Sequence, residues 1–373
     1  MSGSHTADAP ATMSSLIREL AEAESLASIY ALYHHLDRQR RRQGRLLDVL
    51  GFSPREQSGR TVLQQSDMEL RAYGGARNGP VVLLVPAPIK RAYLWDLAPG
   101  ASVVERLLKG GTRPYLIHWQ EPAPESGLAD YAVHHLLAAI RAVQADAGAE
   151  AVFVAGHSLG GLFAAIFATQ HPALVRGVVL LAAPMHFDFG AEAGALGPVI
   201  ARFAQSHVLE RLPGNLPGSA LSFATCTAAP TSYGQDRRSD CLRSLADPNA
   251  LLTHMRVERW SLDELPIARH LLMDMVRHLY GGDGFLRGTL ELAGRPASAN
   301  EFSAPLFVVA DRRCKVVPPA AVLPFYDAVA SRDKQLAWYE GDVGVAIQHV
   351  GPLVGKLAHR HLWPEIVGWI GRH

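Results

Sequence analysis

Short apolar runs recur along most of the chain, and longer segments with helical spacing separate them. The apolar runs are residues 81–85, 114–119, 151–155, 178–182, 305–309 and 335–339. Runs of this kind are typical of strands that are buried on both faces. Apolar positions recur at helical spacing in residues 102–108, 131–147, 160–170 and 319–330. Strands that alternate with helices predict a mostly parallel α/β sheet with helices on both of its faces.

Two parts of the chain do not follow this alternation. The first dozen residues resemble a loose tail, and a helix follows from about Ser15 to Leu50, so residues 1–60 form an N-terminal tail and helix. Residues 61–373 then form the main α/β domain. Within it, residues 186–304 mix helical pieces with Pro, Gly and Asn, and the segment is too long for a plain connection. We expect an inserted cap, or lid, over the sheet.

Composition excludes several classes of protein. Of 373 residues, 48% are hydrophobic and 19% are charged, which excludes a disordered chain. The 36 Lys and Arg nearly balance the 35 Asp and Glu, so a nucleic-acid partner is not expected. The basic run of residues 37–45 is interpreted as a solvated helix face, the alternative being contact with an anionic surface or a partner.

The location expected from the sequence is the cytoplasm. No apolar stretch reaches the roughly 20 residues of a membrane span, and the polar opening residues do not form a secretory signal. The three cysteines, Cys226, Cys241 and Cys314, are scattered and form no disulfide framework.

The most informative motif is Gly156-His157-Ser158-Leu159-Gly160, which follows an apolar strand and precedes a helix rich in small residues. This G-x-S-x-G pattern is typical of a sharp strand-to-helix turn that lifts a nucleophilic serine above the sheet. The two glycines let neighbouring backbone approach closely. We therefore predict that Ser158 is a catalytic nucleophile, because partial positive charge at the helix start favours a developing anion.

A serine hydroxyl needs a base, and in this kind of site the acid and then the histidine follow the serine along the chain. The base should come after the last predicted strand. His349 lies there between glycine-bearing loop segments, and it is our prediction for the base. His359 and His361 are the alternatives, although they precede Trp363-Pro364 and are expected on a surface turn.

The acid and the oxyanion donors are predicted from the ends of strands. Asp311 follows the apolar run 305–309 directly, at the end of a strand where such acids are found; Asp188 and Asp342 are the alternatives. One oxyanion donor should be the backbone N–H of Leu159. The second should come from the loop after residue 85, where Ala87 and Ile89 have an N–H and the two prolines do not.

The wider sequence resembles the polyhydroxyalkanoate synthase family of α/β-hydrolase-fold acyltransferases, from about Pro80 to the C-terminus. Five stretches carry the resemblance, namely residues 85–97, 116–119, 279–294, 316–319 and 362–369. The resemblance implies an α/β-hydrolase fold and an enzyme that takes an acyl group from coenzyme A. It also implies a homo-oligomer or a synthase-type partner subunit.

The chain departs from the family pattern at three positions. The family's nucleophile is usually cysteine, whereas this chain has Ser158. The register of the family's acid, counted back from Pro318, falls on Cys314, and Asp311 lies three positions earlier, so either the loop is shifted to use Asp311 or the acid is missing. The family's histidine follows its last strand at once, whereas here residues 342–348 form a seven-residue insertion before His349. Loops tolerate such extra length at little cost.

Three hypotheses for function follow. The favoured one is a serine hydrolase of an ester or thioester of a hydroxylated or fatty acid, which acts through an acyl-enzyme. The first alternative is an acyltransferase of the polyhydroxyalkanoate synthase kind that uses hydroxyacyl-CoA. The second is a non-catalytic protein that binds acyl ligands. No cofactor is expected except a coenzyme A thioester as substrate, and no metal site, since the sequence lacks HExxH, zinc-ligand spacing and phosphate-binding motifs.

Overall fold

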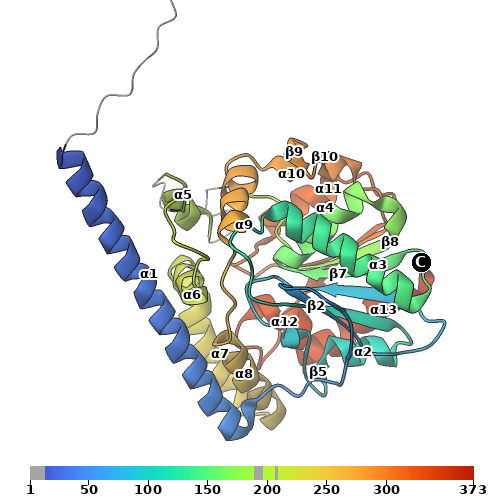
Figure 1. The fold of residues 1–373 in the computed structure, drawn as a ribbon. Coiled ribbons are helices and arrows are strands. Elements are labelled where there is room, and N and C mark those ends of the chain that lie inside the picture. Colours follow the sequence, from blue (N-terminus) through green and yellow to red (C-terminus); the bar gives the residue numbers. More distant parts are fainter. Residues whose placement is uncertain (1–12, 189–195, 206–208) are drawn as a thin grey trace, which may run out of the picture.

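A computed structural model of the chain describes residues 13–188, 196–205 and 209–373, and an eight-stranded sheet forms its centre (Figure 1). The tail predicted for the first dozen residues lies outside the described residues. In spatial order the strands are β1 (Arg60–Gln64), β2 (Met68–Ala72), β6 (Arg113–Trp119), β3 (Val81–Val85), β7 (Val152–His157), β8 (Val175–Leu181), β11 (Leu306–Asp311) and β12 (Lys334–Tyr339).

The sheet is parallel from β6 to β12, and β2 runs antiparallel to both of its neighbours. All six apolar runs of the sequence form strands of its parallel part, so this prediction is confirmed. Strands β3, β7, β8 and β11 are buried at almost every position, as their apolar sequences predict. Strand β12, at the edge of the sheet, is only partly buried. Two short strands, β4 (Asp96–Ala98) and β5 (Ala101–Ser102), form a separate hairpin.

Helices cover both faces of the sheet, as predicted. One face is buried by α3 (Leu136–Ala147), α4 (Leu159–Gln170) and α11 (Leu323–Ala328). The other face is buried by α2 (Val103–Lys109), α12 (Gly351–Val354) and α13 (Trp363–Arg372). Two separate apolar cores result, one on each face, and the sheet lies between them.

Between β8 and β11 the chain leaves the sheet, in the segment where the sequence predicts a cap. Its elements are α5 (Gly197–Gln205), α6 (Gly218–Ala228), α7 (Arg237–Ser244), α8 (Pro248–Ser261), α9 (Arg269–Asp274), α10 (Gly284–Arg287), β9 (Leu290–Leu292) and β10 (Arg295–Ala297). Helices α6, α7 and α8 lie beside the long N-terminal helix, whereas α10, β9 and β10 lie at the opposite end, near α4 (Figure 1).

The N-terminal helix α1 (Met13–Leu47) runs along the edge of the molecule and contacts α6 and α8 (Figure 1). Its contacts are both apolar and polar: Leu26 and Tyr30 pack against a hydrophobic core, and Asp37 Oδ1 accepts a hydrogen bond from the Ser219 N–H at 2.8 Å. Most arginines of the basic run are exposed, but Arg40 is turned inwards and pairs with Glu264 at 2.9 Å. The solvated face expected for this run is thus found at Arg38, Arg41, Arg42 and Arg45 but not at Arg40.

No helix among the described residues has both the length and the apolar character needed to cross a bilayer.

Candidate active site

Ser158 lies at the bend between β7 and α4, in the strand–turn–helix context that the motif predicts. Its φ of 54° is unusual for a residue with a side chain, and such strain is typical of functional turns. The Ser158 N–H donates a hydrogen bond to Leu181 O at the end of β8, at 3.0 Å, which ties the turn to the neighbouring strand. A Cβ on Gly156 would lie 2.5 Å from Gly161 Cα, and a Cβ on Gly160 would clash with Val85 O. Both glycines are therefore required by close backbone packing.

His349 lies in the short helix Gln348–Val350 and lines the same cavities as Ser158. Its backbone carbonyl accepts a hydrogen bond from Nε2 of His157 at 2.9 Å, so the residue next to Ser158 also holds the segment that carries His349. The alternative His359 is buried, contrary to expectation, and its Nε2 donates to Leu353 O at 2.8 Å. His361 is exposed.

Both histidines near Ser158 are neutral at neutral pH. Burial, followed by the nearby charge of His157, lowers the pKa of His349 well below its usual value. Burial likewise lowers the pKa of His157 to about 4, although its bond to the His349 carbonyl opposes the shift. His349 is therefore in the unprotonated form that a general base requires.

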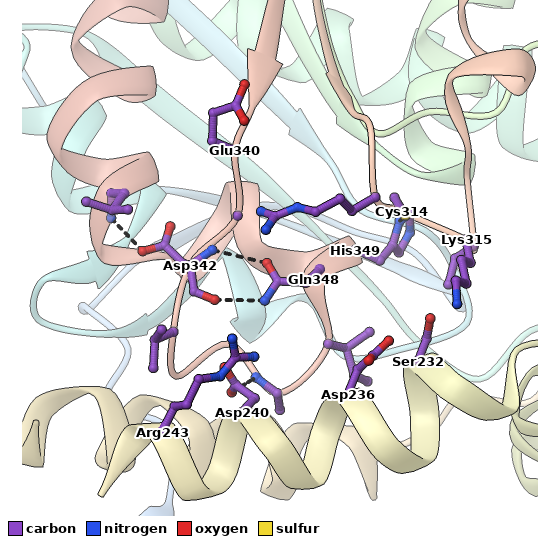
Figure 2. A pocket seen from close by; sticks show the side chains of 17 residues that line it. Ser232, Asp236, Asp240, Arg243, Cys314, Lys315, Glu340, Asp342, Gln348 and His349 are labelled. Carbon is purple, nitrogen blue, oxygen red and sulfur yellow. Dashed lines mark hydrogen bonds between the residues drawn. The ribbon is translucent and has the colours of Figure 1, made fainter. Parts of the chain in front are cut away.

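The partner of the His349 imidazole is Cys314. The Cys314 Sγ atom lies 3.6 Å from Nδ1 of His349, and Figure 2 shows the two side chains next to each other. Burial raises the pKa of Cys314 to about 11, so the group is a neutral thiol at neutral pH. Sγ also accepts a hydrogen bond from the Val317 N–H at 3.4 Å, which fixes its place.

Asp311, the residue predicted as the acid, is placed elsewhere. Its Oδ1 accepts a hydrogen bond from the Arg313 N–H at 2.8 Å, and its buried Oδ2 has no partner among the described residues. Within the same residues, no hydrogen bond or ion pair joins Asp311 to His349. Asp311 is the last residue of β11, and the turn after it brings Cys314 to the imidazole instead.

Neither alternative acid contacts His349 in the described part of the chain. The Asp342 carboxylate accepts hydrogen bonds from the Leu357 N–H at 2.8 Å and the Tyr339 hydroxyl at 3.0 Å. Asp188 is exposed.

Two of the expected oxyanion donors, Ala87 and Ile89, line one small cavity together with Ser158. This cavity is called here the oxyanion cavity, and Leu159 is the first residue of α4. The loop is held close to α4 because Gly160 packs directly on Val85 O. Trp119 fixes it from the other side, since its Nε1 donates to Pro86 O at 2.8 Å. The arrangement suits stabilisation of an oxyanion at Ser158.

A larger cavity of about 200 Å³, called here the serine cavity, extends from Ser158 between the sheet and the helices that follow β8. Most of its wall is apolar, with contributions from Leu159, Ile200, Leu221, Leu272, Met275 and Val317. An apolar cavity beside Ser158 suits an acyl chain.

One wall of the serine cavity is polar and is organised by Glu264. Its carboxylate accepts hydrogen bonds from Arg40 at 2.9 Å, from Lys90 at 2.8 Å and from Ser222. Burial lowers the pKa of Lys90, and the Glu264 charge opposes that shift. The N-terminal helix thus contributes a side chain, Arg40, to the wall of the site.

A third cavity, of about 420 Å³, lies behind Cys314 and His349 and is called here the polar cavity (Figure 2). Charged side chains from α7, from the loop after β11 and from the loop after β12 surround it. Among the described residues, no group of three or more His, Cys, Asp or Glu side chains is arranged to bind a metal ion.

Two functional contacts were not predicted from the sequence. The register with Pro318 did point to Cys314, but nothing in the sequence indicated that its thiol would face the imidazole. The hydrogen bond from His157 to the His349 carbonyl joins residues 192 positions apart, and no local pattern encodes it.

Comparison with known proteins gives related sequences. Residues 117–216 match the family model described as alpha/beta hydrolase fold. The chain is 26% identical over 296 residues to poly(3-hydroxyalkanoate) polymerase subunit PhaC of Haloferax mediterranei, a match that covers 77% of this chain and 58% of the relative. It is 25% identical over 319 residues to subunit PhaC of Allochromatium vinosum, covering 82% of this chain and 88% of the relative. The chain thus spans only 58% of the length of the Haloferax mediterranei relative and 60% of that of subunit PhaC of Haloarcula marismortui.

Solved structures share the fold. A monoacylglycerol lipase from Paleococcus ferrophilus superposes with a TM-score of 0.52 at 17% identity, covering 82% of this chain and 98% of the lipase. A hydrolase from Pseudomonas aeruginosa also has a TM-score of 0.52, at 14% identity, covering 84% of this chain and 98% of that protein. With the parallel sheet and the helices on both faces, these similarities confirm the predicted α/β-hydrolase fold.

Proposed function

We propose that this chain, a polyhydroxyalkanoate synthase-like enzyme of the α/β-hydrolase fold, transfers a hydroxyacyl group from a coenzyme A thioester through Ser158. The observation that carries the proposal is that Ser158, His349 and the loop of Ala87 and Ile89 line one cavity. The polymerase names of the relatives favour transfer to an alcohol over hydrolysis.

The proposed reaction has two balanced steps. His349 takes the Ser158 proton as Oγ attacks the thioester carbonyl, and the proton passes to the departing thiol when the C–S bond breaks. The hydroxyl of an acceptor then attacks the acyl-serine ester, again with His349 as base, and the proton returns to Ser158. Because Cys314 contacts Nδ1 of His349, Nε2 is the nitrogen that remains for these transfers.

A hydrolase, with water as the acceptor, is the second candidate. The observation that favours it is the nucleophile itself: a serine forms an oxygen ester, whereas a thiol exchanges acyl groups readily with a thioester. The serine cavity fits the acyl group under either proposal.

In the experiment, purified protein is incubated with 3-hydroxybutyryl-CoA. Free thiol, free hydroxy acid and oligomer are measured, together with the intact mass of the protein. We expect thiol release, an acyl adduct on Ser158, and oligomer in excess of free acid. Ser158→Ala should release no thiol, and Ser239→Ala, at an exposed serine of α7, should behave like the natural protein.

If free hydroxy acid forms and oligomer does not, the protein is a hydrolase and the transferase proposal is wrong. Thiol release that survives Ser158→Ala would overturn both candidates.

A further inference from the structure

The insertion that precedes His349 contains a strained turn. Gly341 and Gly344 have φ values of 85° and 88°, and Ala346 has a φ of 57° although it carries a side chain. The Ile347 N–H donates to Val345 O at 2.5 Å, which closes a three-residue turn centred on Ala346. Tight turns with positive φ are rare and strained, and they persist only where surrounding groups hold them. The turn ends two residues before the proposed base.

Asp240 of α7 is the group that holds this turn. Its Oδ1 accepts a hydrogen bond from the Gly344 N–H at 3.0 Å, and its Oδ2 accepts one from the Ala346 N–H at 2.8 Å. Among the described residues, no other side chain outside the insertion is hydrogen-bonded to residues 343–347. Figure 2 shows Asp240 on its helix directly beneath the loop.

The Asp240 carboxylate is itself fixed and buried. It is only 1% exposed, and Nδ1 of His254, from α8, donates to Oδ2 at 2.8 Å. Burial opposes its ionisation, but the hydrogen bonds from His254, Gly344 and Ala346 outweigh burial and lower its pKa below the usual value. The group is therefore a carboxylate at neutral pH, in which both oxygens accept.

The loop also rests on α8. A Cβ on Gly344 would lie 2.5 Å from Ala250 O, so the loop backbone touches the start of that helix. Beyond the turn, Gln348 Nε2 donates to Asp342 O at 2.7 Å, and His157 holds the His349 carbonyl. A short series of hydrogen bonds and chain segments thus connects Asp240 to His349.

We propose that Asp240 is a positioning residue for His349, which it holds through the Gly344 and Ala346 N–H groups. In this arrangement the Asp240 carboxylate holds the backbone of the loop that carries His349, while the neutral thiol of Cys314 lies beside the imidazole ring. The inference rests on the proposed function for the role of His349. It assigns part of the support of the site to α7 and α8, which lie outside the sheet.

The test compares Asp240→Asn with Asp236→Asn. The amide keeps the shape of Asp240 but replaces one acceptor oxygen by a donor, so either a loop N–H or His254 loses its acceptor. Asp236, four residues earlier and exposed, also lines the polar cavity without a hydrogen bond to the loop. Amide hydrogen exchange of a peptide covering residues 343–349 is measured together with kcat and KM for thiol release.

We expect Asp240→Asn to speed exchange in that peptide at least tenfold and to lower kcat 10- to 100-fold, with KM changed less than twofold. Asp236→Asn should change none of these. Unchanged exchange, or faster exchange with natural kcat, would overturn the proposal. If the natural protein releases no thiol, the proposed function fails and so does the positioning role, whereas exchange still decides whether Asp240 holds the loop.

Two further variants test the proposal, and the first of them does so even if Asp240→Asn is too unstable. Gly344→Ala leaves Asp240 intact but pushes the loop off Ala250 O, and it should lower kcat in the same way. Ala346→Gly removes the side chain that makes a positive φ costly, and it should restore at least a third of the lost kcat when combined with Asp240→Asn. A double variant no better than Asp240→Asn would contradict the role of the strained turn.

Discussion

The sulfur of Cys314 lies 3.6 Å from Nδ1 of His349, in the place where a serine triad usually has a carboxylate. The thiol is buried, with a pKa raised to about 11, so it brings no charge to the imidazole. A carboxylate in this place orients the ring and stabilises the imidazolium that forms during reaction. Here the neutral thiol can orient the ring of His349, the proposed base, but it cannot stabilise a positive charge on that ring.

Replacement of Cys314 by aspartate should strengthen the base. A carboxylate beside Nδ1 favours the protonated ring, so the acidic limb of the profile of kcat/KM against pH should move up by about one to two pH units. We expect kcat at pH 8 to rise about tenfold, since one triad interaction is gained. A buried carboxylate should also cost about 1–3 kcal/mol of stability in urea unfolding.

Two controls accompany the Cys314→Asp variant. Cys314→Ala should leave the acidic limb where it is, and Asp311→Asn should change the profile little, because Asp311 has no contact with the ring. An unshifted limb in Cys314→Asp would show that residue 314 does not act on the base.

Stability should fall on mild acidification because several histidines are buried in their neutral form. Burial lowers the pKa of His118, His157 and His359 to about 4, against about 6.5 in an unfolded chain. Between these values the unfolded chain binds more protons, so this stabilisation is complete above about pH 6.5 and is lost as the pH falls towards 4. Urea unfolding should show a loss of about 1–2 kcal/mol per histidine between pH 7 and pH 5.

His359→Gln tests this explanation, since glutamine keeps a donor for Leu353 O but does not titrate. The variant should have a shallower slope of stability against pH over the same interval. A slope equal to that of the natural protein would assign the acid sensitivity to other groups.

Gly160→Ala should destroy the site, whereas Gly371→Ala should not. A Cβ at position 160 clashes with the Val85 carbonyl oxygen, which also displaces the oxyanion loop. We expect Gly160→Ala to lower the free energy of unfolding by more than about 2 kcal/mol and to slow labelling of Ser158 by a fluorophosphonate at least 100-fold. At Gly371, in α13, nothing lies within 4 Å of an added Cβ, so alanine should stabilise the helix by up to about 1 kcal/mol. Equal behaviour of the two variants would contradict the close packing at the elbow.

Alkylation should distinguish the three cysteines and mark the acyl site. Cys226 is exposed and lines the serine cavity, Cys241 is half-buried, and Cys314 is buried with a raised pKa. A maleimide should therefore modify Cys226 first and slow hydrolysis of long-chain p-nitrophenyl esters at least tenfold, because the adduct occupies the cavity. Cys226→Ser should protect the activity. Reaction at Cys314 before unfolding would contradict its burial.

The fold could be predicted because its signals are local. Residues 81–85 and 151–155 are apolar throughout, as a strand covered on both faces must be, and the periodicity between them is helical. The sharp turn at Ser158 could be predicted for the same reason, because it needs Gly156 and Gly160 at fixed spacing for backbone packing. His349 followed from chain order alone, and the structure places it at the same cavities as Ser158.

The partner of the base could not be predicted with the same certainty. Asp311 and Cys314 are three residues apart, and both leave the same strand, so the sequence allows either to approach His349. The choice depends on how the turn after β11 closes, with the Cys314 N–H donating to Asp311 O at 3.3 Å. A single such turn is set by packing against distant segments rather than by its own composition.

The sequence by itself thus determined the strands of the sheet, their alternation with helices along the chain, and the sharp turn at Ser158. Each of these features depends on residues that are close together in the chain. Only the tertiary structure decided that a thiol faces the imidazole, that Arg40 reaches the serine cavity, and that Asp240 holds the loop before His349. Each of these contacts joins residues 35 to 224 positions apart. Their energy comes from burial and hydrogen bonding that exist only after the chain has closed around its two cores.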